Sequence, residues 1–470
     1  MSQANQKRKV RGRAIKIGQK ESRKAPGWDL ITGKVVRELS PKCLRILTII
    51  YNSILRLGYF PSLWKVADII MLPKPGKSPD QLTSYRPISL LPLFSKILEK
   101  LLLNRLNPLI EASHALPNHQ FGFRHQHSTV EQVHRIARVI TQSFEAKEYC
   151  SAAFLDISQA FDKVWHVGLL HKLHTLLPPY LYTLLHSYLS DRHFCVRHLG
   201  ARTDLHPICS GVPQGSVLGP TLYLLFTSDI PTTPTTTIAT FADDTALLAS
   251  HPDPAVATAR LQRHLDRLQL WLSKWRIRAN DAKSVHVTFT LRRQTCPPLY
   301  LNGSIIPPAT SVKYLGVHLD RRLTWKTHIQ TKRAHCQTVL RQLYWLLGRH
   351  SSLPLPQKLL LYKAILKPIW TYGIQLWGSA SSSNLEILER FQSKTLRLLT
   401  KAPWFVPNRV LHEDLGVPSI KAEIGRLTSS YSVRLEGHTN PLANSLLQEL
   451  EDQRRLRRYK PLDSLTRYSS

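Results

Sequence analysis

The chain has 470 residues, of which 43% are hydrophobic and 20% are charged. This composition is typical of a globular protein long enough for two or three packed units. Lysine and arginine total 64 against 31 acidic residues, and the resulting net charge of +33 excludes an ordinary metabolic enzyme and favours a polyanionic partner.

Nucleic acid is a better partner for this charge than a membrane. No apolar run reaches the roughly eighteen residues that a membrane span needs, and no amphipathic anchor or lipidation signal is present. Residues 1–20 lack the apolar core of a secretory signal. The six cysteines lie far apart without zinc-site spacing, which predicts reduced structural thiols in an intracellular protein.

The first elements in chain order are a basic tail and a helical region. Residues 1–24 are polar and basic around Lys7–Arg13, and three interpretations stay open: a solvated tail, a phosphate-binding arm or a nuclear import signal. A turn cluster at 24–29 precedes an apolar-periodic helix that runs to about Leu57.

A basic hairpin is expected next. Residues 66–73 have the pattern of a strand that ends at Pro73, and residues 84–90 form its partner. The loop between them carries Lys74 and Lys77, and Arg86 lies on the second strand. Lysine offers a point charge and arginine a bidentate fork, so this hairpin suits a polyphosphate.

Two amphipathic helices follow. Apolar residues recur at spacings of three and four from Leu93 to Leu106, which predicts a helix that stops before Pro108. A loop at 120–124 then precedes a second helix over about 130–147.

Acidic residues stand at the ends of apolar strands in two places. The strand at 152–155 leads directly into Asp156, and the adjacent acids Asp243 and Asp244 occupy the expected tip of a hairpin. Neighbouring carboxylates about 4 Å apart repel by roughly 4 kcal/mol at an effective dielectric near 20. If the two strands are neighbours in one sheet, the three acids predict a site for a divalent metal ion. Between them, residues 211–220 pack glycines and prolines around Gln214, an arrangement that allows close approach to a ligand.

The order of these motifs resembles the reverse transcriptases of non-LTR retrotransposons, and most closely those of the jockey-type elements. The resemblance covers about Lys24 to Pro418. It is carried by the motifs at 85–91, 120–124, 154–162, 211–216 and 241–244, with further similarity at 283–284, 312–317 and 411–418.

This resemblance implies an α+β right-hand polymerase with fingers, palm and thumb, the palm being an antiparallel sheet with helices. The implied division is a basic tail at 1–24, fingers and N-terminal helices at 25–150, a palm at 151–320, a thumb and helical connection at 321–418, and a basic extension at 419–470.

The resemblance also implies the catalytic residues. Asp156, Asp243 and Asp244 would ligate two Mg²⁺ ions, which Mn²⁺ could replace, because nucleotidyl transfer develops charge on both the attacking and the leaving oxygen. Lys283 is a candidate general acid for the pyrophosphate. Its alternative interpretation is an ordinary surface lysine.

Further residues are implied to bind nucleotide and primer. Phe161 would lie beneath the deoxyribose and reject a 2′-hydroxyl by its bulk, which predicts dNTP substrates. The remaining implied residues are Lys74, Arg86 and Arg124 for the triphosphate, Gln214 and Gly215 beside the incoming nucleotide, and Tyr314, Leu315 and Gly316 in a primer-grip turn.

Beyond residue 320 the sequence becomes helical and basic. Five tryptophans of this region are expected in the core, although one or two of them could stack on bases; they are Trp325, Trp345, Trp370, Trp377 and Trp404. The stretch 454–458 either touches phosphate or is a frayed helix end.

The leading functional prediction is an RNA-directed DNA polymerase with an RNA template, a DNA primer and dNTPs as partners, located in the nucleus. The main alternative is a catalytically silent remnant of a mobile element that only binds RNA. A third is a polymerase adapted to a telomerase-like or intron-maturase role. An endonuclease has no room ahead of Lys24, so nicking of the target by this chain is not expected.

Overall fold

The computed structural model describes residues 25–74, 76–81, 84–198, 200–448 and 455–467. The chain forms two compact units, and each is assembled from separate stretches of sequence. The first unit takes the residues up to Pro117, Ile157–Ile230 and Leu270–Arg278, and the second takes Asn118–Asp156, Pro231–Gln269 and the residues from Ala279 on. The five linear domains expected from the sequence stay a prediction, and the basic tail at 1–24 lies outside the described residues.

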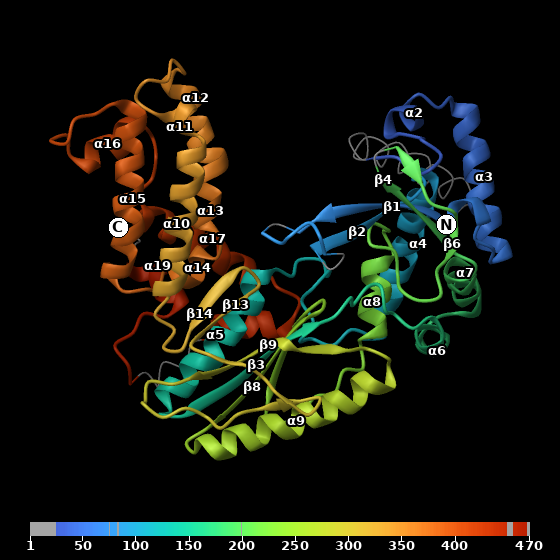
Figure 1. Ribbon diagram of the computed structural model, residues 1–470, viewed down its shortest axis with the longest axis horizontal. Coiled ribbons are helices and arrows are strands. Elements are labelled where there is room, and N and C mark those ends of the chain that lie inside the picture. Colours follow the sequence, from blue (N-terminus) through green and yellow to red (C-terminus); the bar gives the residue numbers. More distant parts are fainter. Residues whose placement is uncertain (1–24, 75, 82–83, 199, 449–454, 468–470) are drawn as a thin grey trace. The chain divides into compact units, whose positions relative to one another are not determined.

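The first unit combines helices with a small sheet (Figure 1). Its helices are α2 (Gly33–Arg37), α3 (Pro41–Leu57), α4 (Leu93–Ala112), α6 (His166–Leu176), α7 (Pro179–Leu189) and α8 (Gly219–Phe226), with a 3₁₀ turn η1 (Ser62–Trp64). Its strands are β1 (Val66–Pro73), β2 (Tyr85–Leu90), β4 (His193–His198), β5 (Ala201–Arg202) and β6 (His206–Pro207). They form a sheet in the order β2-β1-β4-β5, and β6 also pairs with β4.

The predicted basic hairpin is confirmed. β1 and β2 pair antiparallel, with Leu72 opposite Arg86 and Pro73 opposite Tyr85. β1 also pairs in parallel with β4, and the fully buried Asp68 lies on this seam. Its carboxylate is 2.7 Å from the guanidinium of Arg202, so a charge that would be costly to bury alone is paired.

The prediction that a helix ends before Pro108 is wrong. α4 continues to Ala112 with Pro108 inside it. A proline in a helix interior costs about 3 kcal/mol through a lost hydrogen bond and a steric clash. Leu106 and Ile110 are both buried on either side of the proline, and their burial offsets that cost.

The second unit holds the larger sheet, whose strand order is β12-β9-β3-β8-β7. Its strands are β3 (Tyr149–Ile157), β7 (Thr237–Phe241), β8 (Asp244–His251), β9 (Ala279–Phe289) and β12 (Pro308–Ala309). Two short hairpins pair β10 (Tyr300–Leu301) with β11 (Ser304–Ile305) and β13 (Ser311–Tyr314) with β14 (Val317–Asp320).

Helices of the second unit cover this sheet and extend beyond it (Figure 1). Helix α5 (Thr129–Glu145) places Val133, Ile136 and Ile140 in one core cluster with Phe154 of β3 and Leu248 of β8. The other helices are α9 (Pro254–Lys274), which ends in the first unit, α10 (Lys326–Gln342), α11 (Tyr344–Leu347), α12 (Leu355–Leu361), a π-helical turn η3 (Tyr362–Leu366), α13 (Lys367–Thr371), α14 (Ile374–Trp377), α15 (Ser382–Thr400), α16 (Asn408–Asp414), α17 (Ile420–Glu436), α18 (Pro441–Asn444), η4 (Ser445–Leu447), η6 (Pro461–Asp463) and α19 (Ser464–Arg467). The combination of sheets and helices confirms the α+β class.

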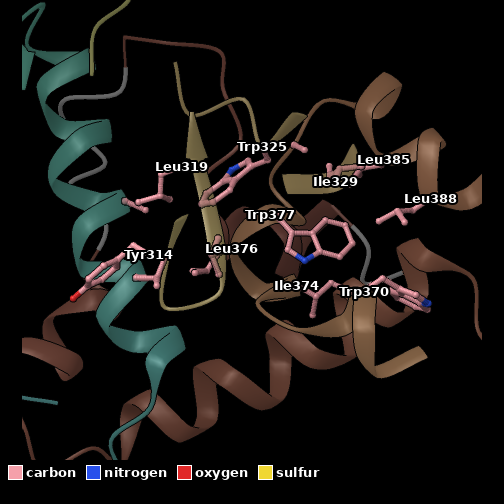
Figure 2. Close-up of a cluster of buried hydrophobic side chains, with 14 of the residues drawn as sticks. Tyr314, Leu319, Trp325, Ile329, Trp370, Ile374, Leu376, Trp377, Leu385 and Leu388 are labelled. Carbon is pink, nitrogen blue, oxygen red and sulfur yellow. The ribbon is translucent and has the colours of Figure 1, made fainter. Parts of the chain in front are cut away.

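The helical region beyond β14 has an aromatic core. Figure 2 shows Trp325, Trp370 and Trp377 among Leu and Ile side chains, and all three tryptophans are buried. The expectation that Trp345 and Trp404 are also core residues is wrong, because they are 73% and 87% exposed. Both follow the C-terminal ends of long helices, Trp345 in the short helix α11 after α10 and Trp404 in the loop after α15.

The described part of the basic stretch 454–458 is not helical. The backbone N–H groups of Arg455 and Leu456 donate to the carboxylate of Glu145, and the Arg455 guanidinium donates to the Phe144 carbonyl at 2.8 Å. These contacts satisfy groups at the C-terminal end of α5. Arg454 lies outside the described residues.

The search for membrane spans found no helix of sufficient length and apolarity in the described part of the chain. All six cysteines are free thiols, of which Cys43 and Cys209 are exposed.

Candidate active site

The predicted acidic hairpin is present in the second unit. β7 and β8 pair antiparallel up to Phe241 opposite Asp244, which leaves Ala242 and Asp243 as the turn. Ala242 has a φ of +57°, in the left-handed region that such tight turns require. β3 lies next to β8 with Leu155 opposite Thr245, so Asp156 and Asp244 stand at the same end of neighbouring strands. The expectation that these strands are neighbours is confirmed.

The three carboxylates influence each other's charge. Two causes raise the pKa of Asp244 to about 6. The larger is burial of its carboxyl group, and the smaller is the negative charge of Asp243 and Asp156. The repulsion between like charges, although the smaller cause, shows that the three carboxylates lie close enough to affect one another. The cluster is short of positive charge.

Lys283 is the one predicted catalytic residue that contacts these acids from another strand. Its Nζ lies 3.8 Å from Oδ2 of Asp156, and the two side chains are 60% and 48% exposed. An exposed ion pair of this kind contributes about 0–1 kcal/mol. The neighbouring Ser284 hydroxyl accepts the backbone N–H of Asp156 at 3.3 Å, which fixes the start of β9 beside the end of β3. The role of Lys283 stays a prediction.

The donor chemistry of this cluster fits a hard divalent cation, because Mg²⁺ prefers carboxylate oxygen. Among the residues that the structure describes, no three Asp, Glu, His or Cys side chains already converge as a closed metal cage. The carboxylate of Asp156 faces the ammonium of Lys283 instead. The acids therefore fit a cation by charge and by ligand type, and their side chains would have to turn together to enclose it.

A buried glutamine that the sequence reasoning did not assign supports the acidic turn. Gln120 is 4% exposed, and its Oε1 accepts the backbone N–H of Ala242 at 2.9 Å and that of Gly122 at 2.8 Å. Its Nε2 donates to the Ala242 carbonyl at 3.4 Å. One side chain thus holds both polar backbone groups of the residue that precedes Asp243.

The segment that carries Gln120 is itself fastened along β7. Phe121 N–H donates to the Thr240 carbonyl at 2.9 Å, and Thr240 N–H donates to the His119 carbonyl at 3.1 Å. Gln132 of α5 donates to both carbonyls, His119 and Thr240, at 2.9 and 2.8 Å. The signal in the sequence is the polar Gln120 two residues before Gly122, in a loop that also carries Phe121 and Phe123.

The residues predicted to line the nucleotide belong to the first unit, with the exception of Arg124. Gln214 Nε2 lies 3.3 Å from Oδ1 of Asp162. The pKa of Asp162 is raised by burial, while the Gln214 hydrogen bond and the charge of Lys74 oppose that rise. The structure therefore brings Lys74 and Gln214 together around an acid, Asp162, to which the sequence reasoning gave no role.

The glycine loop is fixed against β2. The Ser89 N–H donates to the Gln214 carbonyl at 2.8 Å. Gly215 has a φ of +127°, and a Cβ there would lie 2.4 Å from the Ser89 carbonyl oxygen, so only glycine fits. This close approach joins the loop to the strand that carries Arg86, whose side chain is exposed.

Phe161 and Arg124 have different surroundings. The Phe161 ring stacks on Tyr223 with centroids 4.7 Å apart, and its carbonyl accepts the Val212 N–H at 2.8 Å. Arg124 belongs to the second unit and donates to the Gln120 carbonyl at 3.2 Å. Its described contact is with the segment that supports the acidic turn.

The predicted primer-grip turn is a tight hairpin. Leu315 and Gly316 join β13 to β14 with φ values of +45° and +80°. The Tyr372 hydroxyl lies 2.6 Å from the Leu315 carbonyl oxygen. The Tyr314 side chain is buried and its hydroxyl donates to the Ala239 carbonyl at 3.3 Å, so only the turn itself is available to a ligand.

Comparison with known proteins agrees with this arrangement. A sequence profile of the family "Reverse transcriptase (RNA-dependent DNA polymerase)" matches residues 72–319, more than half of the chain. Enzymes of this family depend in general on divalent metal ions.

Three curated relatives are similar over nearly all of this chain. The RNA-directed DNA polymerase from mobile element jockey of Drosophila melanogaster is 45% identical, covering 90% of this chain and 47% of the relative. The probable RNA-directed DNA polymerase from transposon X-element of the same species is 42% identical, covering 96% and 50%. The jockey polymerase of Drosophila funebris is 42% identical, covering 96% and 51%. The chain spans about half the length of these relatives.

The family resemblance inferred from the motifs is confirmed by these matches. The profile spans Asp156, Asp243 and Asp244, and the relatives extend the similarity to both sides of it. The chain belongs to the reverse transcriptase family and resembles most strongly the polymerases of non-LTR retrotransposons.

Proposed function

We propose that this chain is the RNA-directed DNA polymerase of a mobile element, which adds dNTPs to the 3′-end of a primer on an RNA template. The observation that carries the proposal is the placement of Asp156 and the Asp243–Asp244 turn at one end of adjacent strands. Family membership supports the same reaction, since the relatives are named for it.

Asp156, Asp243 and Asp244 are the residues that would hold two Mg²⁺ ions. When bound, the ions would stabilise the charge on the attacking 3′-oxygen and on the leaving pyrophosphate. The like-charge interactions of Asp244 with Asp243 and Asp156 support this assignment, because a bound cation would offset them. Gln120 keeps the turn in place while the charge around it changes.

Five residues of the first unit would bind the incoming nucleotide. Lys74 directly follows β1 and Arg86 lies on β2 of the same hairpin, and both would neutralise the triphosphate. Gln214 and Gly215 form a loop fixed to β2 that presents backbone and amide groups to a ligand. The stacking of Phe161 on Tyr223 holds a bulky ring in one position, which supports its proposed role in excluding a 2′-hydroxyl.

Lys283 would supply a proton to the leaving oxygen. Its position next to Asp156 supports this role, because an ammonium near the acids can donate as negative charge develops. The alternative interpretation is that Lys283 only balances the charge of Asp156.

A nuclear location and a DNA primer are part of the same proposal, and they follow from the reaction and from the basic sequence at Lys7–Arg13.

The test is extension of an oligo(dT) primer on poly(rA) by the purified protein. We expect incorporation of dTTP with Mg²⁺, no incorporation with EDTA, and little incorporation of UTP. Asp243→Ala should abolish extension and leave RNA affinity nearly unchanged, whereas the matched control Asp204→Ala, which replaces an exposed acid in a loop, should keep both. Extension that survives Asp243→Ala contradicts the metal assignment.

A second candidate function is RNA binding without catalysis, which the net charge of +33 favours. The same assay separates the two candidates. A folded protein that binds poly(rA) with affinity falling steeply in salt, and that incorporates no dTTP, supports the silent remnant.

A further inference from the structure

Two short segments in the helical part of the second unit each carry a pair of exposed aromatic side chains. Trp404 and Phe405 are 87% and 67% exposed, and Trp345 and Tyr344 are 73% and 50% exposed. Large aromatic side chains normally supply buried area, so four exposed ones within two short segments require an explanation. We call these four residues the aromatic platform.

Both segments lie at the same end of the helical region. Helices α10 and α15 begin side by side, because Asn384 at the start of α15 donates to the Thr324 carbonyl just before α10 at 3.1 Å. The two helices pack against each other and are 17 and 19 residues long, so each extends about 25–29 Å. Their C-terminal ends therefore reach the same end, where Figure 1 shows α11 and α16.

The loop that bears Trp404 and Phe405 is held in shape by one arginine. Arg397 of α15 donates to the carbonyls of Pro403 at 2.9 Å and Val406 at 2.7 Å, and to Oδ1 of Asn408 at 2.7 Å. These three bonds fix the loop on both sides of the two rings. The rings are exposed although their backbone is ordered.

The segment after Trp345 is fastened in the same way. Lys358 is 2% exposed, and its Nζ donates to the Gly348 carbonyl at 3.2 Å and to the Ser351 carbonyl at 3.4 Å. A buried lysine is costly unless its charge finds such acceptors. Both halves of the platform are therefore preorganised by a cationic side chain, which lowers the entropy lost when a ligand binds.

The charges around the platform have one sign. Residues 338–360 and 393–412 contain seven lysines and arginines and no acid. The nearest acid in sequence, Glu413, pairs with Arg409 at 3.0 Å. The seven cationic residues are Arg341, Arg349, Lys358, Lys394, Arg397, Lys401 and Arg409.

We propose that the aromatic platform binds a single-stranded segment of nucleic acid, with bases stacked on Trp404, Phe405 and Trp345 and with phosphates near Lys401 and its cationic neighbours. Exposed rings on segments rich in cationic side chains match a strand that carries a π-face and a charge at every nucleotide. A protein interface is less favoured, because charged residues as a class are depleted at the core of such interfaces. The site is separate from the three acids and goes beyond the polymerase function.

The test is binding of a fluorescent oligo(A) of about 16 nucleotides to the full chain. We expect the double variant W404A/F405A to bind about tenfold more weakly, with the slope of log affinity against log salt unchanged. Lys401→Gln should instead reduce that slope by about 0.7. Trp404→Tyr should keep most of the affinity, because it keeps a ring.

The matched control is Tyr300→Ala, which removes another exposed ring of the second unit that lies on β10 and outside both segments of the platform. It should bind like the wild type. Binding of a blunt RNA duplex should be unaffected by W404A/F405A, since paired bases offer no free face. If W404A/F405A loses affinity for oligo(dA) as well as for oligo(A), the site binds both DNA and RNA. If it loses affinity for oligo(A) alone, the site is specific for RNA.

Unchanged oligo(A) affinity of W404A/F405A, in protein with wild-type circular dichroism, overturns the proposal. Equal weakening by Tyr300→Ala, or equal weakening for the duplex, also overturns it. The binding assay contains neither dNTPs nor Mg²⁺. Its result therefore does not depend on whether the chain is an active polymerase.

Discussion

At the scale of single residues, Gly122 shows how little room surrounds the acidic turn. A Cβ at this position would lie 2.2 Å from the backbone nitrogen of Ala242. No real Cβ is found so close to another heavy atom, and the obstructing atom belongs to the backbone. The turn that carries Asp243 can therefore keep its position only while residue 122 has no side chain.

We expect Gly122→Ala to displace the Ala242–Asp243 turn and to lower the rate of dTTP incorporation by about a hundredfold or more, since about 1 Å of misplacement can cost that much. The measurement is single-turnover extension of oligo(dT) on poly(rA). Gly437→Ala is the matched control, because a Cβ at Gly437 meets nothing within 4 Å. Equal rates for the two variants would show that the turn does not depend on this contact.

Gln120 gives a second test of the same support. Gln120→Ala leaves the Ala242 and Gly122 N–H groups without their acceptor, whereas Gln120→Glu keeps an acceptor in place. We expect Gln120→Ala to raise the Mg²⁺ concentration needed for half-maximal extension and Gln120→Glu to restore part of the loss. A purely structural role would lower thermal stability in both variants without moving the Mg²⁺ dependence.

The sequence predicted the acids of this site but not their support. Adjacent carboxylates between apolar runs are costly without a cation, and this conflict is visible in a local stretch of sequence. The contact of Gln120 with the turn is made to backbone atoms of Ala242, 122 positions away along the chain, and backbone atoms carry no sequence signal. Asp162 was likewise visible in its motif, while its contact with Gln214 depends on tertiary structure.

At the scale of elements, the β13–β14 turn depends on a helix-capping segment far along the chain. The Tyr372 ring lies against Gly316, where a Cβ would be 3.0 Å from Cε1, and its hydroxyl approaches both Leu315 and Thr129. The side chain of Tyr372 thus holds the proposed primer-grip turn in place, by packing against Gly316 and by hydrogen bonding to Leu315.

We expect Tyr372→Phe to destabilise the protein by about 1 kcal/mol through the lost hydrogen bond. Because the ring remains under Gly316, the fold should persist while the KM for the primer rises. Steady-state extension at varied primer concentration measures this effect, with Tyr300→Phe as the control. An unchanged KM for the primer would show that the β13–β14 turn does not contribute to primer binding.

Helix α17 contains a buried acid whose pairing makes stability depend on pH. Glu423 is 1% exposed and contacts Lys367 at 3.1 Å and Arg426. Burial opposes ionisation, but hydrogen bonds and charges from Arg426 and Lys367 prevail and lower the pKa of Glu423 below its usual 4.5. Its contribution to stability is therefore present above pH 4.5 and is lost as the pH falls through the lowered pKa.

We expect Glu423→Gln to lower the melting temperature at neutral pH and to leave it closer to the wild-type value in acid. Thermal melts across the acidic range measure the difference. Glu386→Gln, which removes an exposed partner of Arg390, is the control and should change little. A difference for Glu423→Gln that stays constant with pH would contradict the lowered pKa.

Elements with a local signal were predicted well, and the exceptions have physical reasons. The β1–β2 and β7–β8 hairpins follow from alternation and turn residues over short spans. The continuation of α4 through Pro108 depends on buried contacts made by Ile110, which outweigh a local rule. The exposure of Trp345 and Trp404 was missed because an aromatic residue in an apolar stretch is usually buried, and the ends of a helical bundle are not marked in the sequence.

At the scale of the whole molecule, neither compact unit is a continuous piece of chain. Glu99 of α4 is fully buried, and its carboxylate accepts the backbone N–H of Val217 at 2.7 Å and that of Leu218 at 3.2 Å. Burial raises the pKa of Glu99, and these bonds oppose the rise. The part of the unit that ends at Pro117 therefore needs residues 157–230 to supply the hydrogen bonds of a buried acid.

We expect a fragment that ends at Pro117 to lack fixed tertiary structure, because it leaves the buried Glu99 carboxylate without its two N–H donors and leaves β1 without β4. Near-ultraviolet circular dichroism should show no ordered aromatic signal from the fragment, while the full chain shows one. A cooperative melt of the fragment alone would show that the first stretch is an independent folding unit.

The sheet of the second unit places strands side by side that are far apart in the sequence, and this order affects how the chain can fold during synthesis on the ribosome. Strand β3 ends at Ile157, while its neighbour β9 is complete only at Phe289. At about 5–20 residues per second, β3 waits roughly 7–26 seconds for that partner. Asp156 is thus translated long before Asp243 and Lys283, and a nascent chain cannot assemble the acidic site until all of these residues have emerged. Premature termination in that interval leaves β3 without a complete β9, the strand that carries Lys283 beside Asp156.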